Sequence, residues 1–446
     1  MDKLTDKSIE LVNFIKSNMM VNTIDINNDT ISHIKETINQ ITPEYNNRIT
    51  TSTIDIQKEI NDPPVVFDVY KKIKDLRSVI PAEDIDKVKD MIASDGHESF
   101  IEWYLLNHRY LDIPYDIGKR EIDKLKYPHN LKKSLYGSPF MAIDIQKYFE
   151  SHKFYHTKCT CSFKNDKLGD IVIDLYEPYD HKQINIDEII KICSMMRLFK
   201  PKHANVQINL TLIASHLKKK LGKIKGSDII LPKHVNSAST MRGEFIYIWR
   251  YEEWKKILIH ELIHYLKIDF DPHKSGFGTL VESLNSIFKV SGNLFPFESY
   301  TEIIAVLIHS VYVSQNLDIK LEEILLYELN FSLFQCAKIL KYIGFTDIET
   351  FITPSMPSDL QLTQMTGTLS YFFIKTALLN NSQLFSYLGP DINFKDSTLQ
   401  KYQKLIHDSL NNESFKKNIN KYLDNFNSIT DNEKIKLTMR MSCVQY

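Results

Sequence analysis

Residues 251–267 read Tyr-Glu-Glu-Trp-Lys-Lys-Ile-Leu-Ile-His-Glu-Leu-Ile-His-Tyr-Leu-Lys, and this stretch predicts the centre of the fold. Its apolar residues on most sides predict a buried helix. His260 and His264 are four positions apart, so on a helix they lie about 40° apart around the axis and one turn apart along it. Both imidazoles can then reach one metal ion, and two histidines at this spacing are typical of a zinc site.

Glu261 lies between these histidines, about 100° from His260 and about 60° from His264 around a helix. It is near enough to contact a water at the metal without being a ligand, which is the position of a general base. In a chain of this composition the five-residue pattern arises by chance only about 0.03 times. The alternative is a buried helix whose histidines bond to backbone carbonyls. Burying two histidines and a carboxylate together is costly without a strong partner such as a metal.

A catalytic zinc site requires a third protein ligand, and the sequence leaves its identity open. The commonest continuation places a histidine six residues after His264, but Phe270 occupies that position. A downstream carboxylate is therefore expected. Three glutamates qualify by residue type, namely Glu282, Glu298 and Glu302.

The segment around Glu302 resembles the second helix of the gluzincin metallopeptidases. In that family a glutamate followed three residues later by alanine completes a site of two histidines and one glutamate, and here Ala305 follows Glu302. The resemblance therefore implies Glu302 as the third zinc ligand. Glu298, one turn earlier, is expected as an outer partner or as a helix-start carboxylate. Glu282 keeps a spacing from His264 close to that of the thermolysin-like enzymes.

The stretch from His234 to His264 is similar to the upper lobe of gluzincins, with a polar edge strand, a buried strand and then the motif helix. In that family the edge strand pairs with an extended peptide substrate, and residues 236–240 are the matching segment. Its His-Val-Asn-Ser and Arg-Tyr-Glu-Glu-Trp segments also look similar to metallopeptidase-like proteins of large DNA viruses. The resemblance covers about residues 200–310. The Gly, Met and Asn signature of the exopeptidases is absent, which argues against recognition of a free N-terminal amine.

The remaining patterns predict an α+β, predominantly helical protein in three parts, whose central and last parts form a gluzincin-like zincin core. Residues 1–138 are expected to be a mainly helical N-terminal region, with a polar, proline-containing linker over 42–67. Residues 139–270 are expected to form an α/β upper lobe with a small mixed sheet, ending in the motif helix. Its expected elements are strands over 153–163, 169–176, 206–212 and 245–250 and a helix over 186–199. Residues 271–446 are expected to form a helical lower lobe that carries the third ligand.

Composition bounds the classes of partner. The chain has 446 residues with 55 Lys and Arg against 56 Asp and Glu, which gives no general attraction for nucleic acid or membrane surfaces. Lys218–Lys220, with Lys223 and Lys225, form a local basic patch that is interpreted as solvated. Five cysteines, no signal-peptide pattern and no bilayer-length apolar run lead us to expect an intracellular protein without nucleic-acid or membrane partners.

Together these observations predict a zinc peptidase acting on a peptide or protein substrate. Glu261 would take a proton from the attacking water and deliver it to the leaving amine. Tyr371 is selected as donor to the oxyanion, ahead of Tyr300 and His309. One alternative is an inactive structural or virion protein that retains the fold, although the intact Glu261 argues against it. Another is a metal-dependent hydrolase of a non-peptide bond, which the sequence does not exclude.

Overall fold

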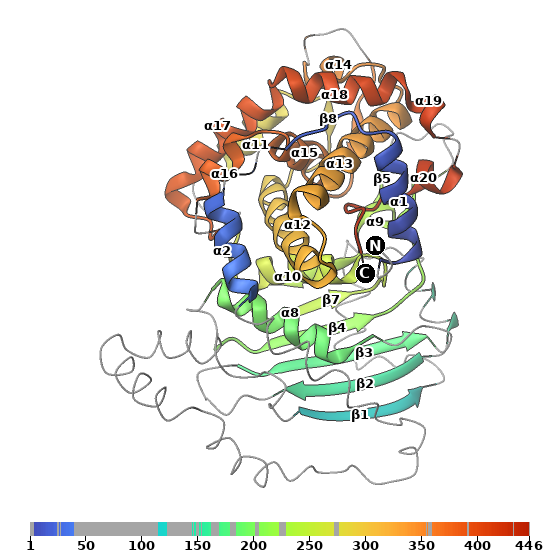
Figure 1. Ribbon diagram of the computed structural model, residues 1–446, viewed down its shortest axis with the longest axis vertical. Helices are drawn as coiled ribbons and strands as arrows, with labels where there is room; N and C mark the ends of the chain where they lie inside the picture. Colours follow the sequence, from blue (N-terminus) through green and yellow to red (C-terminus); the bar gives the residue numbers. More distant parts are fainter. Residues whose placement is uncertain are drawn as a thin grey trace.

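Figure 1 shows the protein as a computed structural model. It describes residues 4–24, 26, 28–39, 115–122 and most of 145–445. The gaps within that last stretch are 146, 149–150, 153, 162–168, 179–183, 201–204, 223–228, 272–275, 354, 356–358, 390–391 and 431. The linker predicted over 42–67 and the helical patterns of residues 69–111 lie outside the described residues.

One layer of the molecule is a six-stranded mixed sheet with strand order β1-β2-β3-β4-β7-β6. Its strands are β1 (Tyr115–Ile122), β2 (Phe154–Cys161), β3 (Ile171–Pro178), β4 (Ile208–Ile213), β6 (Ala238–Met241) and β7 (Phe245–Ile248). The first three pair antiparallel, β3-β4 and β4-β7 pair parallel, and β6 returns antiparallel to β7. Strand β6 therefore forms one edge of this sheet.

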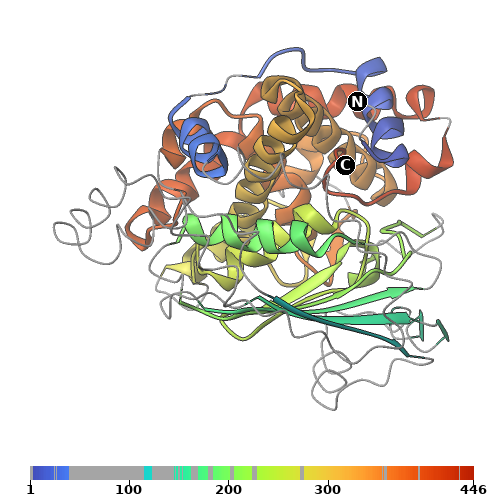
Figure 2. The same ribbon diagram turned by 60° about the horizontal axis from the view of Figure 1, so that its bottom comes forward.

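The second layer is helical, and Figure 2 shows the described helices on one side of the large sheet. Its main helices are α1 (Asp6–Ser17), α8 (Ile186–Leu198), α10 (Trp254–Tyr265), α12 (Pro296–Leu317), α13 (Leu321–Ile343), α17 (Leu399–Leu410) and α18 (Glu413–Asp424). Within this layer α10 lies against the sheet, because it packs against the strands β6 and β7 as well as the helices α8 and α12. A helix that is buried on every side needs an apolar residue at most positions, and its sequence supplies them.

The smaller elements complete the helical layer. They are α2 (Asn28–Asn39), α9 (Pro232–Val235), α11 (Phe277–Asn285), α14 (Ile348–Ile352), the π-helix η4 (Leu369–Ile374), α15 (Lys375–Leu379), α16 (Gln383–Leu388), the 3-10 helix η5 (Asp396–Thr398), α19 (Phe426–Ile429) and α20 (Glu433–Leu437). A three-stranded sheet has the order β5-β9-β8, with bounds Ile229–Ile230, Leu362–Gln364 and Val290–Ser291. The predicted predominance of helix, with a small mixed sheet, is confirmed.

The described helices of the predicted N-terminal region, residues 1–138, pack against the helical layer. Helix α1 packs against α13, and α2 packs against α12. The buried Leu11, Val12 and Ile15 of α1 explain why, since this apolar stripe needs a partner. The 138/139 boundary also separates β1 from its neighbour β2. Strand β1 was not predicted, because its position depends on pairing with β2 rather than on a pattern of its own.

Residues 439–445 lie against the start of α10. Glu253, the residue before α10, has a left-handed backbone with φ of 62° and is buried. Its Oε1 accepts hydrogen bonds from the backbone N–H groups of Met441 (3.0 Å) and Ser442 (2.7 Å), and its Oε2 forms an ion pair with Lys219. The expectation that the basic patch is solvated is thus wrong for Lys219, because a buried carboxylate requires a cation beside it. Lys223 and Lys225 lie outside the described residues.

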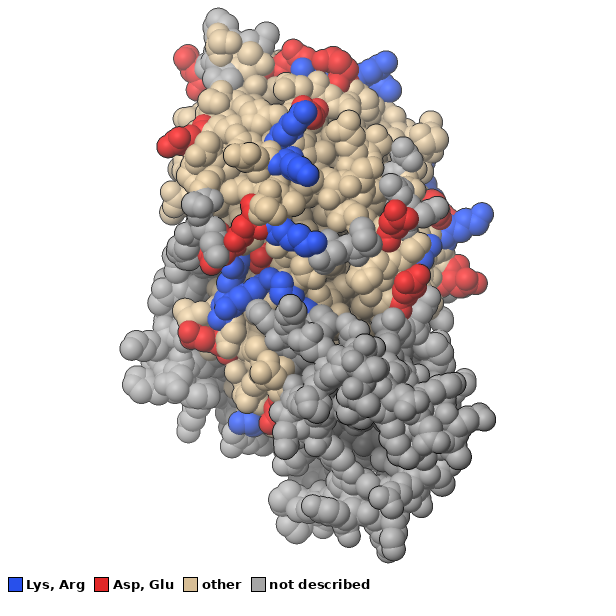
Figure 3. All heavy atoms as spheres, turned by 90° about the vertical axis from the view of Figure 1, so that its left-hand side faces the viewer, with Lys and Arg blue, Asp and Glu red and all other residues tan. Residues whose placement is uncertain are grey.

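The described surface carries both signs of charge. On the face drawn in Figure 3, Lys and Arg side chains are interspersed with Asp and Glu over the described part. In the part of the chain that the structure describes, no helix combines the length and the apolar character needed to cross a bilayer.

The buried pair of Glu253 and Lys219 generates a stability prediction. Glu253→Gln keeps an oxygen for Met441 and Ser442 but removes the carboxylate that forms the ion pair with the buried Lys219 ammonium. We expect the free energy of unfolding, measured by urea denaturation, to fall by about 3–5 kcal/mol. The control Glu413→Gln removes a carboxylate whose side chain is 85% exposed, and should change it by less than about 0.5 kcal/mol.

The same pair predicts how the stability difference between wild type and Glu253→Gln depends on pH. Burial by itself raises the pKa of Glu253, but the Lys219 ammonium and further cations outweigh burial, and the pKa lies below its ordinary value of 4.5. The ion pair therefore contributes fully above that value and is lost as the pH falls through the lower folded-state pKa. The difference in free energy of unfolding between wild type and Glu253→Gln should become smaller in acid. A gap that is constant with pH would contradict this account.

Candidate metal centre

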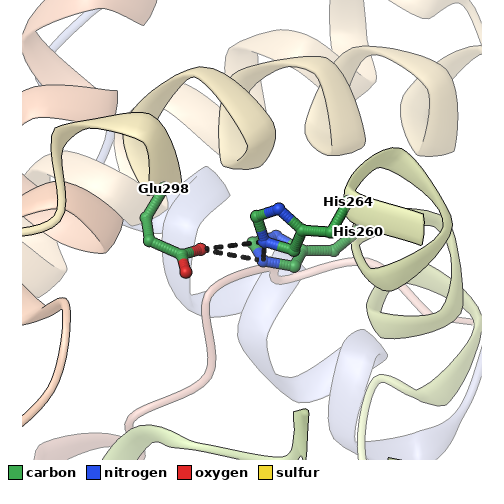
Figure 4. Close-up of side chains that lie close together, drawn as sticks. All are labelled: His260, His264 and Glu298. Atoms are coloured by element: carbon green, nitrogen blue, oxygen red, sulfur yellow. Dashed lines mark hydrogen bonds and ion pairs between the residues drawn. The ribbon is translucent and has the colours of Figure 1, made fainter. Parts of the chain in front are cut away.

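Three side chains from two helices meet at one point. His260 and His264 extend from α10, and Glu298 extends toward them from the first turn of α12 (Figure 4). The distances between His260 Nε2, His264 Nε2 and Glu298 Oε2 are each 3.2 Å. Ligands about 2.0–2.1 Å from a zinc ion at tetrahedral angles lie about 3.3 Å from one another. The three donors could therefore hold one metal ion.

The turn at the end of α10 brings Asp269, which is five positions after His264, back beside that histidine. Lys267 has a left-handed backbone with φ of 57°, and the N–H of Ile268 donates to the carbonyl of Ile263 (2.9 Å). This reversal directs Asp269 back along the helix. Its Oδ2 lies 2.6 Å from Nδ1 of His264.

Asp269 fixes the orientation of the His264 ring. Its Oδ1 accepts a hydrogen bond from Arg242 (2.8 Å), and its Oδ2 also accepts one from the Thr301 hydroxyl (3.1 Å). With the proton on Nδ1 facing this carboxylate, Nε2 presents a lone pair to the centre. Carboxylates in this position are typical partners of metal-binding histidines.

Glu302 faces His260 in the same way, so the geometry favours Glu298 over the expected Glu302 as the third donor. Its Oε2 lies 2.9 Å from Nδ1 of His260, and its Oε1 pairs with the ammonium of Lys256. Nδ1 and Nε2 lie at opposite edges of an imidazole, so a carboxylate bonded to Nδ1 faces away from the point where the Nε2 atoms meet. Glu298 occupies that point instead. Glu282 is exposed on α11 and takes no part.

The charges in the centre favour an ionised Glu298, which is the form that binds metal. They also favour protonated imidazoles, whereas only neutral imidazoles bind metal. Burial raises the pKa of Glu298, but His264 and His260 outweigh burial and hold the pKa well below its usual range. Burial lowers the pKa of His264, but Asp269 and Glu298 outweigh it and raise the pKa well above its usual value. A metal ion arriving here would therefore displace protons from the imidazoles.

A small pocket of about 40 Å³ that is partly open to solvent adjoins the centre. Glu261 lines it beside His260, and burial raises the pKa of this glutamate against the opposing effect of both histidines. A raised pKa makes a carboxylate a stronger base. The other lining residues are Lys219, Val235, Asn236, Ser237, Ala238, Lys256, Ile257, Glu302, Tyr371 and Met441.

Tyr371 is the one of the three expected oxyanion donors that lines the pocket. It lies on η4, its ring centroid is 6.0 Å from that of His260, and burial together with the nearby carboxylates of Glu298, Glu261 and Glu302 raises the pKa of its hydroxyl well above the usual value. A Cβ on Gly367 would come within 3.1 Å of the Tyr371 ring, so glycine makes room for this side chain. The other two pack in the core: the Tyr300 hydroxyl donates to the carbonyl of Ile392 (2.7 Å), and burial lowers the pKa of His309 to about 3.

The sequence did not predict the residues that bond to Nδ1 of His264 or to the carboxylates beside the two histidines. Asp269 had a detectable signal, since it is an acidic residue just beyond the motif helix. Lys256 had another, because it and Lys255 interrupt the apolar residues before the motif and Lys256 lies one turn before His260. Arg242 and Thr301 had none, because their contacts to Asp269 depend on the tertiary fold.

The donor geometry predicts which glutamate binds metal. Glu298→Ala removes a ligand atom and should weaken binding of Zn²⁺ at least about a hundredfold in competition with a chelator. Glu282→Ala, in the exposed glutamate that sequence alone left as a candidate, should bind as wild type does. Unchanged affinity in Glu298→Ala would show that the carboxylate is not a ligand.

Comparison of the chain with protein-family models, with curated proteins and with solved structures finds no match. The function is therefore inferred from Glu261, from the pocket, and from the donor triangle, which is the set of three donor atoms of His260, His264 and Glu298.

Proposed function

We propose that the protein is a zinc-dependent peptidase in which His260, His264 and Glu298 hold the metal. The observation that carries this proposal is the set of equal 3.2 Å separations between the three donor atoms. Structural zinc sites use four protein ligands, whereas catalytic sites use three and leave a position for water or substrate. Among the described residues the donor group has three members and adjoins a pocket. Two imidazoles and one carboxylate are a donor set that suits zinc.

Zinc in this place would supply a Lewis acid that polarises a scissile carbonyl and lowers the pKa of water. Glu261 lies in the pocket outside the donor group, and in our proposal it accepts the proton of the attacking water and returns it to the leaving amine. A site kept only for structure has no use for this carboxylate. Tyr371 also lines the pocket, and in our proposal its hydroxyl donates to the oxygen on which charge develops.

The order of elements before the centre supports a gluzincin-like core as part of this proposal. Strand β6, strand β7 and helix α10 follow one another along the chain, and β6 is the edge of the large sheet next to α10. An extended peptide can add to such an edge through backbone hydrogen bonds. The pocket reaches the residues just before β6, Val235 to Ser237, and Ala238 at the start of β6. A peptide along this edge would therefore pass beside Glu261.

Glu261→Gln tests the proposed base. The amide cannot accept the proton, so cleavage of a proteome-derived peptide library should fall at least about a hundredfold, while zinc content remains about one per chain. Equal cleavage by both proteins would remove Glu261 from the mechanism. A wild-type protein that binds zinc but cleaves no peptide in the library would instead favour a non-peptide substrate.

Tyr371→Phe tests the proposed oxyanion donor. Loss of a hydrogen bond made mainly in the transition state should lower kcat by about 10²–10³ and leave KM within about twofold. Tyr300→Phe is the matched control, because that hydroxyl is occupied by a core carbonyl, and its kcat should stay near that of wild type. A change in KM with unchanged kcat would assign Tyr371 to binding only.

A further inference from the structure

Two chains of hydrogen-bonded groups support the donor triangle from outside. In each, an imidazole Nδ1 faces a carboxylate, and the other oxygen of that carboxylate meets a cation. One chain runs from His264 through Asp269 to Arg242. The other runs from His260 through Glu302 to Lys256.

The two chains differ in burial. The Arg242 side chain is 24% exposed, and Asp269 has a further donor in Thr301. The Lys256 side chain is 2% exposed and that of Glu302 is fully buried. Water can replace a lost partner in the first chain far more easily than in the second. Lys256 is therefore the cation on which its carboxylate depends more strongly.

The helix geometry makes Lys256 specific for this task. Lys256 precedes His260 by four positions, so α10 supplies both the imidazole and the cation, and α12 inserts Glu302 between them. The adjacent Lys255 points elsewhere and pairs with Glu188 of α8 (3.1 Å). Two neighbouring lysines of one buried helix thus serve different carboxylates.

We propose that Lys256 is a positioning residue that sets the metal affinity of the centre. Its ammonium occupies one oxygen of Glu302, so that the other oxygen faces Nδ1 of His260 and the ring turns Nε2 toward Glu298. This inference rests on the metal centre proposed above. Loss of an outer partner of a metal-bound histidine typically weakens metal binding about 10- to 100-fold.

The test is the affinity of the full chain for Zn²⁺, measured by competition with a chelator. Lys256→Met should bind about 10- to 100-fold more weakly than wild type. Arg242→Met should lose less than Lys256→Met, because its chain is partly solvated. Lys255→Met is the matched control on the neighbouring position, and its affinity should equal that of wild type. A Lys256→Met protein with wild-type affinity would overturn the proposal.

A double variant separates positioning from a general structural role. Glu302→Gln keeps an oxygen that accepts from Nδ1 of His260 but carries no charge for Lys256 to hold. Lys256→Met added to Glu302→Gln should therefore cause no further loss of affinity. A further tenfold loss would show that Lys256 acts by a route other than Glu302 and would reject the inference. This comparison also removes both buried charges together, so it remains decisive if Lys256→Met alone does not fold.

Failure of the inference is distinct from failure of the proposed function. If the wild type binds Zn²⁺ and the Lys256 variants bind equally well, the proposed metal centre is retained and the positioning role of Lys256 is rejected. If the wild type binds no Zn²⁺, both fall.

Discussion

The complete burial of α10 is the constraint on which the rest of the structure depends. Every residue of this helix is buried, including two lysines, two histidines and a glutamate. Ionisable groups without water require partners within the protein. Helices α8 and α12 and the turn after α10 supply them, as Glu188, Glu298, Glu302 and Asp269. The helical layer around α10 therefore provides counter-charges as much as it provides apolar contacts.

The local features of the centre could be predicted from sequence because they depend on spacing within one helix. The positions of His260, Glu261 and His264 follow from a period of 3.6 residues, and the strands predicted over 169–176 and 206–212 follow from alternation. The structure has β3 and β4 in those places. Tyr371 reaches the pocket as expected, although the residue pattern gave little ground for choosing it.

The choice between Glu298 and Glu302 could not be made in this way. The two are one turn apart on the same face of α12, so periodicity treats them alike. The two differ because of the point along α10 at which α12 packs against it. This packing places Glu298 at Nε2 of His260 and Glu302 at Nδ1. The burial of Lys219 and the packing of α1 on α13 were missed for a related reason. Each depends on residues distant in the chain, and neither leaves a local pattern.

The contact of residues 439–445 with the start of α10 has a consequence for how the centre is made. Met441 donates to Glu253 across 188 positions of the chain. During translation the motif helix leaves the ribosome long before the segment that anchors its first turn. The start of α10 therefore gains these contacts only after a further 188 residues have been synthesised. Until that point the buried carboxylate of Glu253 lacks the two backbone donors that it has in the finished fold.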